Sequence, residues 1–136
     1  TERRSIFESG VLKTYFIDTY NSRKMGVAPT VNSPSLLVLK PGSKTLEALV
    51  VDVQKGILVT GFNGGNCNSS SGDFSYGIEG FLIENGKLTQ PVNEMNVTGN
   101  MLTLWASLVA VGNDPRMSSS WRIPSLVFEG VDFSGL

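Results

Sequence analysis

The dipeptide Asn85-Gly86 constrains this fold more than any other feature of the sequence. Asparagine followed by glycine tolerates positive φ at both central positions of a type I′ turn, so it closes a two-residue β-hairpin. Such a turn fixes the register of the strands that flank it. It predicts that Glu84 faces Lys87, as an opposite-charge pair, and that Ile83 faces Leu88.

The strand before this turn is predicted from alternating apolar residues. From Phe74 to Ile78, apolar residues occupy every second position, the period of a strand with one buried face. The apolar positions then move to Phe81 and Ile83. This change of phase predicts that an extra residue is absorbed as a β-bulge at Gly80.

Capping residues predict two helices in the first half of the chain. Asp18 is a suitable N-cap for a short helix through Met25, with Gly26 as its left-handed C-terminal residue. Thr45 is a suitable N-cap for a second helix, which we expect to be closed by Gly56.

A third helix is predicted after the hairpin. It begins near residues 98–100, its apolar face extends to Val109, and residues 111–115 end it. Short strands are expected at residues 11–17, 35–39, 57–60, 123–128 and 131–133. The predicted fold is therefore α+β: a single domain, residues 1–136, with a mostly antiparallel, barrel-like β-sheet and about three helices.

Residues 61–72 have the composition of a loop, because glycine, asparagine and serine dominate them. We predict a flexible surface loop here. Its single cysteine, Cys67, is the only one in the chain, so it cannot form an internal disulfide. A reducing compartment, the cytoplasm, fits this composition, and no segment has the apolar length of a membrane span.

The balance of charge argues against nucleic-acid and membrane surfaces. Eleven basic and twelve acidic residues give a net charge of −1, without a long run of either sign. The chain also contains no histidine, so it lacks the usual general base of serine and cysteine hydrolases and the commonest zinc ligand. The acidic residues are scattered without motif spacing, which favours helix caps and solvated edges over a catalytic pair. We predict no catalytic and no metal-binding residue in this chain.

Several further motifs follow one another in a fixed order along the chain. They include Gly72-Asp73-Phe74-Ser75, Ile83 to Lys87, and Val111-Gly112-Asn113-Asp114. Together with Gly10 to Gly26, Lys40-Pro41-Gly42 and Pro124-Ser125-Leu126, they cover nearly the whole chain. In this order they resemble the C-terminal domain of the TldD/PmbA (TldE) family, to which the name "modulator of DNA gyrase" is attached. The resemblance implies that the chain is the C-terminal domain of a longer protein.

The family resemblance also implies a function. TldD-type members are zinc metalloproteases whose His-Glu-x-x-x-His motif lies outside this region, joined by a cysteine that follows the Val-Gly-Asn-Asp segment. PmbA/TldE-type members lack these ligands and pair with TldD to enclose an unfolded peptide. The segment after Asp114 has no cysteine. The chain therefore resembles the non-catalytic type, in a homo- or heterodimer with a TldD-like subunit, with zinc only in TldD-type relatives.

Two other functions stay open from the sequence. A full-length version could be a catalytic TldD-like zinc metalloprotease, or a regulator associated with DNA gyrase without direct contact to nucleic acid. If the domain touches an unfolded peptide, a strand edge that holds the peptide backbone is the expected mode. The candidate contact residues, in loops at the ends of strands and helices, are Asn63, Gly65, Asp73, Phe74 and Asn113.

Overall fold

The computed structural model describes residues 2–135, which divide into two compact units, residues 2–37 and 38–135. Each unit is described by itself. Strand β3 (Leu37–Val38) spans the boundary between them.

The first unit contains one hairpin and one helix. Strands β1 (Phe7–Glu8) and β2 (Val11–Leu12) pair antiparallel around Ser9 and Gly10, which both have positive φ. Helix α1 (Thr19–Met25) begins and ends as predicted, because Asp18 accepts a hydrogen bond from the Asn21 amide and Gly26 is left-handed.

The strand predicted over residues 11–17 is shorter than expected and ends at Leu12. The residues before the helix are held by Thr30 instead of by a ladder. The Thr30 hydroxyl accepts a hydrogen bond from the Ile17 amide at 2.9 Å, and the Thr30 amide donates to the Ile17 carbonyl at 2.9 Å. At Ile17 the hydrogen bonds of Thr30 therefore take the place of the expected strand pairing.

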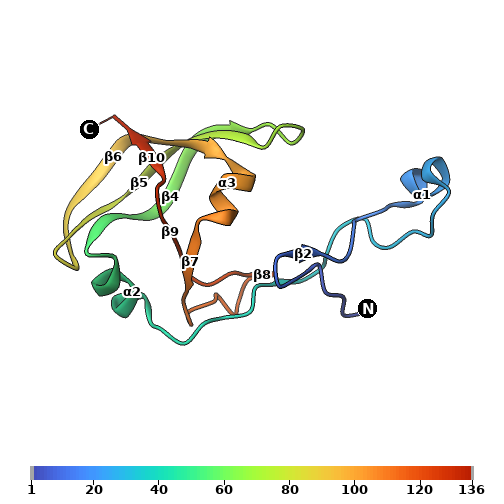
Figure 1. Ribbon diagram of the computed structural model, residues 1–136, viewed down its shortest axis with the longest axis horizontal. Helices are drawn as coiled ribbons and strands as arrows, with labels where there is room; N and C mark the ends of the chain where they lie inside the picture. Colours follow the sequence, from blue (N-terminus) through green and yellow to red (C-terminus); the bar gives the residue numbers. More distant parts are fainter. Residues whose placement is uncertain (1, 136) are drawn as a thin grey trace. The chain divides into compact units, whose positions relative to one another are not determined.

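The second unit is organised on a four-stranded antiparallel sheet in the order β10-β6-β5-β4 (Figure 1). Its strands are β4 (Lys55–Cys67), β5 (Asp73–Glu84), β6 (Lys87–Asn100) and β10 (Asp132–Ser134). With three helices and mostly antiparallel strands, the described chain is α+β, as predicted. Among residues 2–135 the sheet is open, with β4 and β10 as its outer strands, and it does not close on itself.

The hairpin between β5 and β6 has the predicted geometry. Asn85 and Gly86 have φ values of 51° and 70°, as a type I′ turn requires. Glu84 pairs with Lys87 and Ile83 with Leu88, which confirms the predicted register.

The predicted bulge at Gly80 was placed on the wrong strand. The register does change on both sides of Gly80, but the extra residues lie on the flanking strands, where Thr60 in β4 and Glu94 in β6 fall next to the shifts. Glu94 has φ of 57°. Along β5 the buried positions continue through Gly80, and Phe81 is 38% exposed. The buried positions change from even-numbered to odd-numbered residues only at Ile83, which is buried.

The expected flexible loop at residues 61–72 is mostly strand. β4 continues to Cys67 and pairs with β5 up to Phe74, so only residues 68–72 turn the chain. The pairing with β5 outweighs the local preference of glycine and asparagine for loops, since sheet propensity depends strongly on tertiary context.

The helix predicted after the hairpin is also shorter than expected. α3 (Met101–Ala106) ends at Ser107, whose hydroxyl and amide both donate to the Leu104 carbonyl. The residues that continue its apolar periodicity form β7 (Leu108–Val111), which pairs with β9 (Leu126–Phe128). β-Branched valines in this segment suit a strand, and a partner strand is available.

The other predicted elements differ at their ends. α2 (Leu46–Val53) is capped by Thr45 as predicted, but it ends at Gln54, and Gly56 already belongs to β4. The expected strands at residues 35–39 and 131–133 are β3 and β10. The strand expected at residues 123–128 is confined to β9, after the short strand β8 (Trp121–Arg122).

The hydrophobic core lies on one face of the sheet. Its buried residues come from β5 and β6: Phe74, Ile78, Val92, Met95 and Val97. Ile78 and Met95, which face each other in the ladder, are 0% and 2% exposed. The outer strand β4 is held by its pairing with β5 and by Ile57, Val59 and Cys67, which pack against this core.

Candidate peptide-binding edge

Strand β4 presents the longest outer edge of the sheet. It has 13 residues, and it pairs with β5 on one side only among the residues that the structure describes. From Phe62 to Asn66 all residues are exposed. Unpaired backbone N–H and C=O groups on such an edge can pair with another extended chain.

Two of the candidate contact residues, Asn63 and Gly65, lie on this edge at a register shift. Between the pairs Phe62 with Ile78 and Gly65 with Tyr76, β4 contains one residue more than β5. Gly65 has φ of 108°, and a Cβ atom there would lie 2.1 Å from the Ser75 carbonyl oxygen. Only glycine fits this close approach of two backbones.

The neighbouring strand has a matching glycine. A Cβ atom on Gly77 would lie 2.4 Å from Oδ1 of Asn63, so the Asn63 side chain packs against the bare backbone of β5. This packing gives the exposed end of β4 a defined shape instead of the mobility that its composition suggests.

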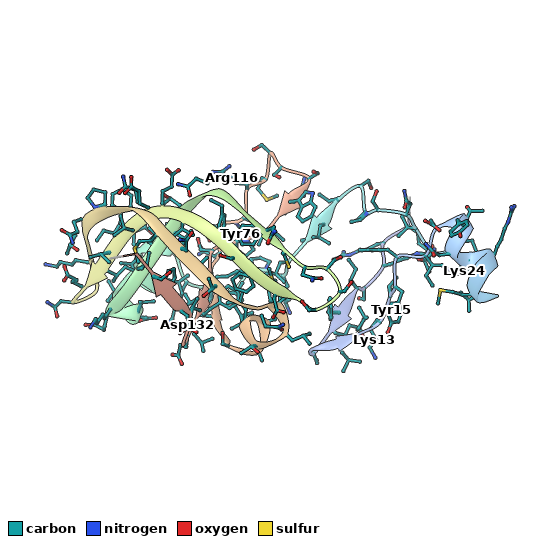
Figure 2. All side chains as sticks on the ribbon, turned by 90° about the horizontal axis from the view of Figure 1, so that it is seen from above. Lys13, Tyr15, Lys24, Tyr76, Arg116 and Asp132 are labelled. Carbon is teal, nitrogen blue, oxygen red and sulfur yellow. The ribbon has the colours of Figure 1, made fainter. Side chains whose placement is uncertain are left out.

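An aromatic row runs from the core to the exposed end of β4. The rings of Phe74 and Tyr76 stack with centroids 6.1 Å apart, and the rings of Tyr76 and Phe62 meet edge to face at 5.7 Å. Figure 2 shows Tyr76 on the second unit. Phe74 is 7% exposed and belongs to the core, whereas Phe62 is 67% exposed. Phe62 is thus the accessible aromatic residue beside the edge, and sequence analysis did not single it out.

The turn that joins β4 to β5 is tied to helix α3. Asp73 accepts hydrogen bonds from Asn100 Nδ2 at 2.9 Å and from the Ser71 hydroxyl at 2.8 Å. Asn100 also caps α3 by accepting from the Leu102 amide at 3.0 Å. The hydrogen bonds from Asn100 and Ser71 hold the pKa of Asp73 below its ordinary value. Asp73 thus acts as a structural acceptor at the base of the turn.

The last candidate residue, Asn113, lies in a different group of contacts. Its amide donates to the Lys44 carbonyl at 2.9 Å, and its side chain donates to the Ser43 carbonyl at 3.3 Å. The next residue, Asp114, accepts from both the amide and the hydroxyl of Ser125, at 2.9 and 2.7 Å. These hydrogen bonds connect the segment after β7 to residues 43–44 and to Ser125. We therefore interpret this group of contacts as structural.

Two opposing effects act on the pKa of Asp114. Partial desolvation raises the pKa, but the hydrogen bonds from Ser125 and from its own amide together outweigh it and leave the pKa lowered. A carboxyl with a lowered pKa is ionised at neutral pH and is a poor proton donor. Sequence analysis placed Asp114 near an element end but could not find its pairing with Ser125, which lies 11 residues away.

Within residues 2–135 no group of three or more cysteine, aspartate and glutamate side chains is arranged to hold a metal ion. Cys67 is half-buried in β4, with Sγ 3.9 Å from the Asn68 carbonyl oxygen and 4.0 Å from that of Gly72. None of the helices in that part of the chain is long and apolar enough to cross a membrane.

Comparison with protein families gives a match over residues 1–135 to the model of the PmbA/TldA metallopeptidase C-terminal domain. Among curated proteins, Metalloprotease PmbA of Escherichia coli O157:H7 is 30% identical over 137 residues, which cover 99% of this chain and 30% of that protein. The PmbA homologue of Buchnera aphidicola subsp. Baizongia pistaciae is 30% identical over 139 residues, 100% of this chain and 31% of that protein. The chain therefore spans about a third of the length of these relatives.

Solved structures with the same fold are also longer than this chain. A proposed modulator of DNA gyrase from Bacteroides thetaiotaomicron is 77% identical with a TM-score of 0.96, covering 100% of this chain and 31% of that one. Another from Thermotoga maritima is 36% identical with a TM-score of 0.84, covering 95% and 32%. TldE from Thermococcus kodakarensis shares the fold with a TM-score of 0.82 at 23% identity, covering 96% and 33%.

Proposed function

The chain belongs to the PmbA/TldD metallopeptidase family, and from this premise we propose that it is the C-terminal domain of a longer, non-catalytic PmbA/TldE-like subunit. In this proposal the domain holds an unfolded peptide within a two-subunit peptidase and takes no part in bond cleavage. The observation that carries the proposal is the exposed outer edge of β4, in a chain whose segment after Asp114 contains no cysteine.

The edge supports peptide holding because an extended chain can add to a sheet through backbone hydrogen bonds alone. Such binding tolerates many sequences, which suits an unfolded substrate. Asn63 and Gly65 lie on this edge, and Asp73 and Phe74 support it from the neighbouring strand. Asn113 is proposed only as a secondary contact, since its polar groups already bond to Ser43 and Lys44.

The metal and the partner are inferred from the relatives alone. The E. coli relative is named a metalloprotease, so we expect zinc in the assembled peptidase, with ligands from outside this chain. We propose a homo- or heterodimer that includes a TldD-like subunit, and the cytoplasm as the compartment.

The test uses the full-length protein that contains this domain. We expect it to contain less than stoichiometric zinc and to cleave no unfolded peptide alone, but to support cleavage when a TldD-like subunit is added. Stoichiometric zinc together with turnover by the protein alone would contradict the proposal. It would favour the alternative function, that of a catalytic TldD-like zinc metalloprotease.

A second alternative, association with DNA gyrase, has its support in the names of two solved relatives. The net charge of −1 argues against direct contact with DNA. A DNA affinity that falls steeply with salt concentration would favour this alternative, and we expect none.

A further inference from the structure

The dipeptide Asn-Gly occurs twice in the chain, at Asn63-Gly64 in β4 and at Asn85-Gly86 in the turn between β5 and β6. Asparagine is a chemically labile residue. It reacts most readily before glycine, because glycine has no Cβ atom to obstruct an attack by its backbone nitrogen. The two copies have the same reacting groups, so a difference between their rates in the folded protein reflects the structure around them.

The reaction to which this dipeptide is prone is deamidation. The glycine nitrogen forms a bond to Cγ of the asparagine, the side-chain nitrogen leaves as ammonia and takes up the glycine amide proton, and a succinimide ring closes. Water then opens the ring and leaves aspartate or isoaspartate. In a folded chain the glycine nitrogen must therefore be able to give up its proton and to approach Cγ.

At the turn, the glycine nitrogen is held by another segment. The Gly86 amide donates a hydrogen bond to the Gln54 carbonyl at 3.0 Å, and Gly86 is buried. A Cβ atom on Gly86 would lie 3.0 Å from Gln54 Nε2 and 3.0 Å from the Val51 carbonyl oxygen, so the end of α2 packs directly on this glycine. Deamidation of Asn85 therefore requires the turn to separate from α2 first, with loss of that hydrogen bond.

In β4, the same dipeptide lies in an open environment. Asn63 and Gly64 are both exposed, and they lie where the register with β5 shifts, between the paired residues Phe62 and Gly65. Apart from its chain neighbours, no atom of the described residues lies within 4 Å of the Cβ position of Gly64. The Asn63 side chain packs against the bare backbone of Gly77. Among residues 2–135, β4 has a partner strand on one side only, so its outer side leaves the backbone room to move.

We propose that Asn63 is a site of spontaneous deamidation and that the fold protects the same dipeptide at Asn85. Conversion of Asn63 to aspartate adds a negative charge to the outer edge of β4. Conversion to isoaspartate inserts the side-chain Cβ atom into the backbone, just before the pairs that Gly65 and Asn66 make with β5. Either product changes the edge. The inference goes beyond the proposed function and does not depend on it.

The test incubates the folded full-length protein at mildly alkaline pH, where the glycine amide gives up its proton more readily. Peptide mapping by mass spectrometry then follows both asparagines through the mass gained when OH replaces NH2. We expect Asn63 to convert about tenfold faster than Asn85 or more, since loss of the hydrogen bond at the turn slows the reaction by about that factor. Asn63→Gln is the control variant, because glutamine would have to close a larger ring. It should show no conversion at position 63.

The same protein unfolded in guanidinium chloride provides a second measurement. Without the turn and the sheet, Asn63 and Asn85 should convert at similar rates, and Asn85 should convert faster than it does in the folded protein. Conversion of Asn85 in the folded protein that equals or exceeds that of Asn63 would overturn the proposal. A ratio of the two rates that is the same in the folded and unfolded proteins would also overturn it, because the neighbouring residues and not the fold would then set the rates.

Discussion

Gly80 lies so close to the backbone of Leu58 that a Cβ atom on the glycine would come within 1.9 Å of the Leu58 carbonyl oxygen. The two residues meet where β4 and β5 change register, and Gly80 itself is buried. The contact joins the outer strand to the middle of the sheet. This close contact therefore constrains the shape of the β4 edge.

We predict that Gly80→Ala lowers the free energy of unfolding by roughly 3 kcal/mol, because the methyl group would displace backbone and not a flexible side chain. Urea or thermal unfolding of the protein measures this change. Gly130→Ala is the matched control: Gly130 has φ of 65° but open space around its Cβ position. The control should cost only about 1 kcal/mol. Equal losses for the two variants would argue against the close approach.

We predict that Asn100→Ala also destabilises the protein. The substitution removes the N-cap of α3 and the bonds from Asn100 Nδ2 to Ser71 and Asp73. Loss of a helix cap typically costs about 1 kcal/mol. Unfolding experiments should show this loss, whereas Asn93→Ala, at an exposed position of the same strand β6, should leave stability nearly unchanged. A neutral Asn100→Ala would contradict the role of this side chain as a tie between turn and helix.

We predict that Asp114 makes a contribution to the free energy of unfolding that is lost in acid. Because its pKa is lowered in the folded protein, its contribution is complete above the ordinary value of 3.8 and is lost as pH falls through the lower folded value. The difference in unfolding free energy between the protein and Asp114→Asn should therefore shrink between about pH 5 and about pH 2. Parallel pH profiles of the two proteins would show that Ser125 does not stabilise the ionised carboxylate.

The local signals of the sequence predicted local structure well. Asn85-Gly86 fixed its own turn and register, and Asp18 and Thr45 each cap a helix as expected. These signals act over a few residues, so they do not depend on what the segment packs against.

The predictions were wrong where pairing between strands outweighs the preference of a segment for a local structure. Residues 61–67 have a loop composition, yet they extend β4, because β5 offers a partner. Val109 continues the helical period of α3, yet it lies in β7, which pairs with β9. Long-range pairing of this kind cannot be read from a window of neighbouring residues.

The candidate site was predictable only in part. Sequence analysis chose Asn63 and Gly65, but it placed them in a loop, whereas they lie on an outer strand. It missed Phe62, because the contact of that ring with Tyr76 depends on the irregular register of β4. The signal that was available is a lone aromatic residue within a glycine- and asparagine-rich segment.

Photo-crosslinking in the full-length protein, together with a TldD-like subunit, is the sharpest test of whether the β4 edge holds an unfolded peptide. A photoreactive residue replaces Asn63 on β4 in one sample and Glu129, an exposed position after β9, in the control. We predict that an unfolded peptide is captured at position 63 and not at position 129. Capture at both positions alike, or at neither, would contradict the claim.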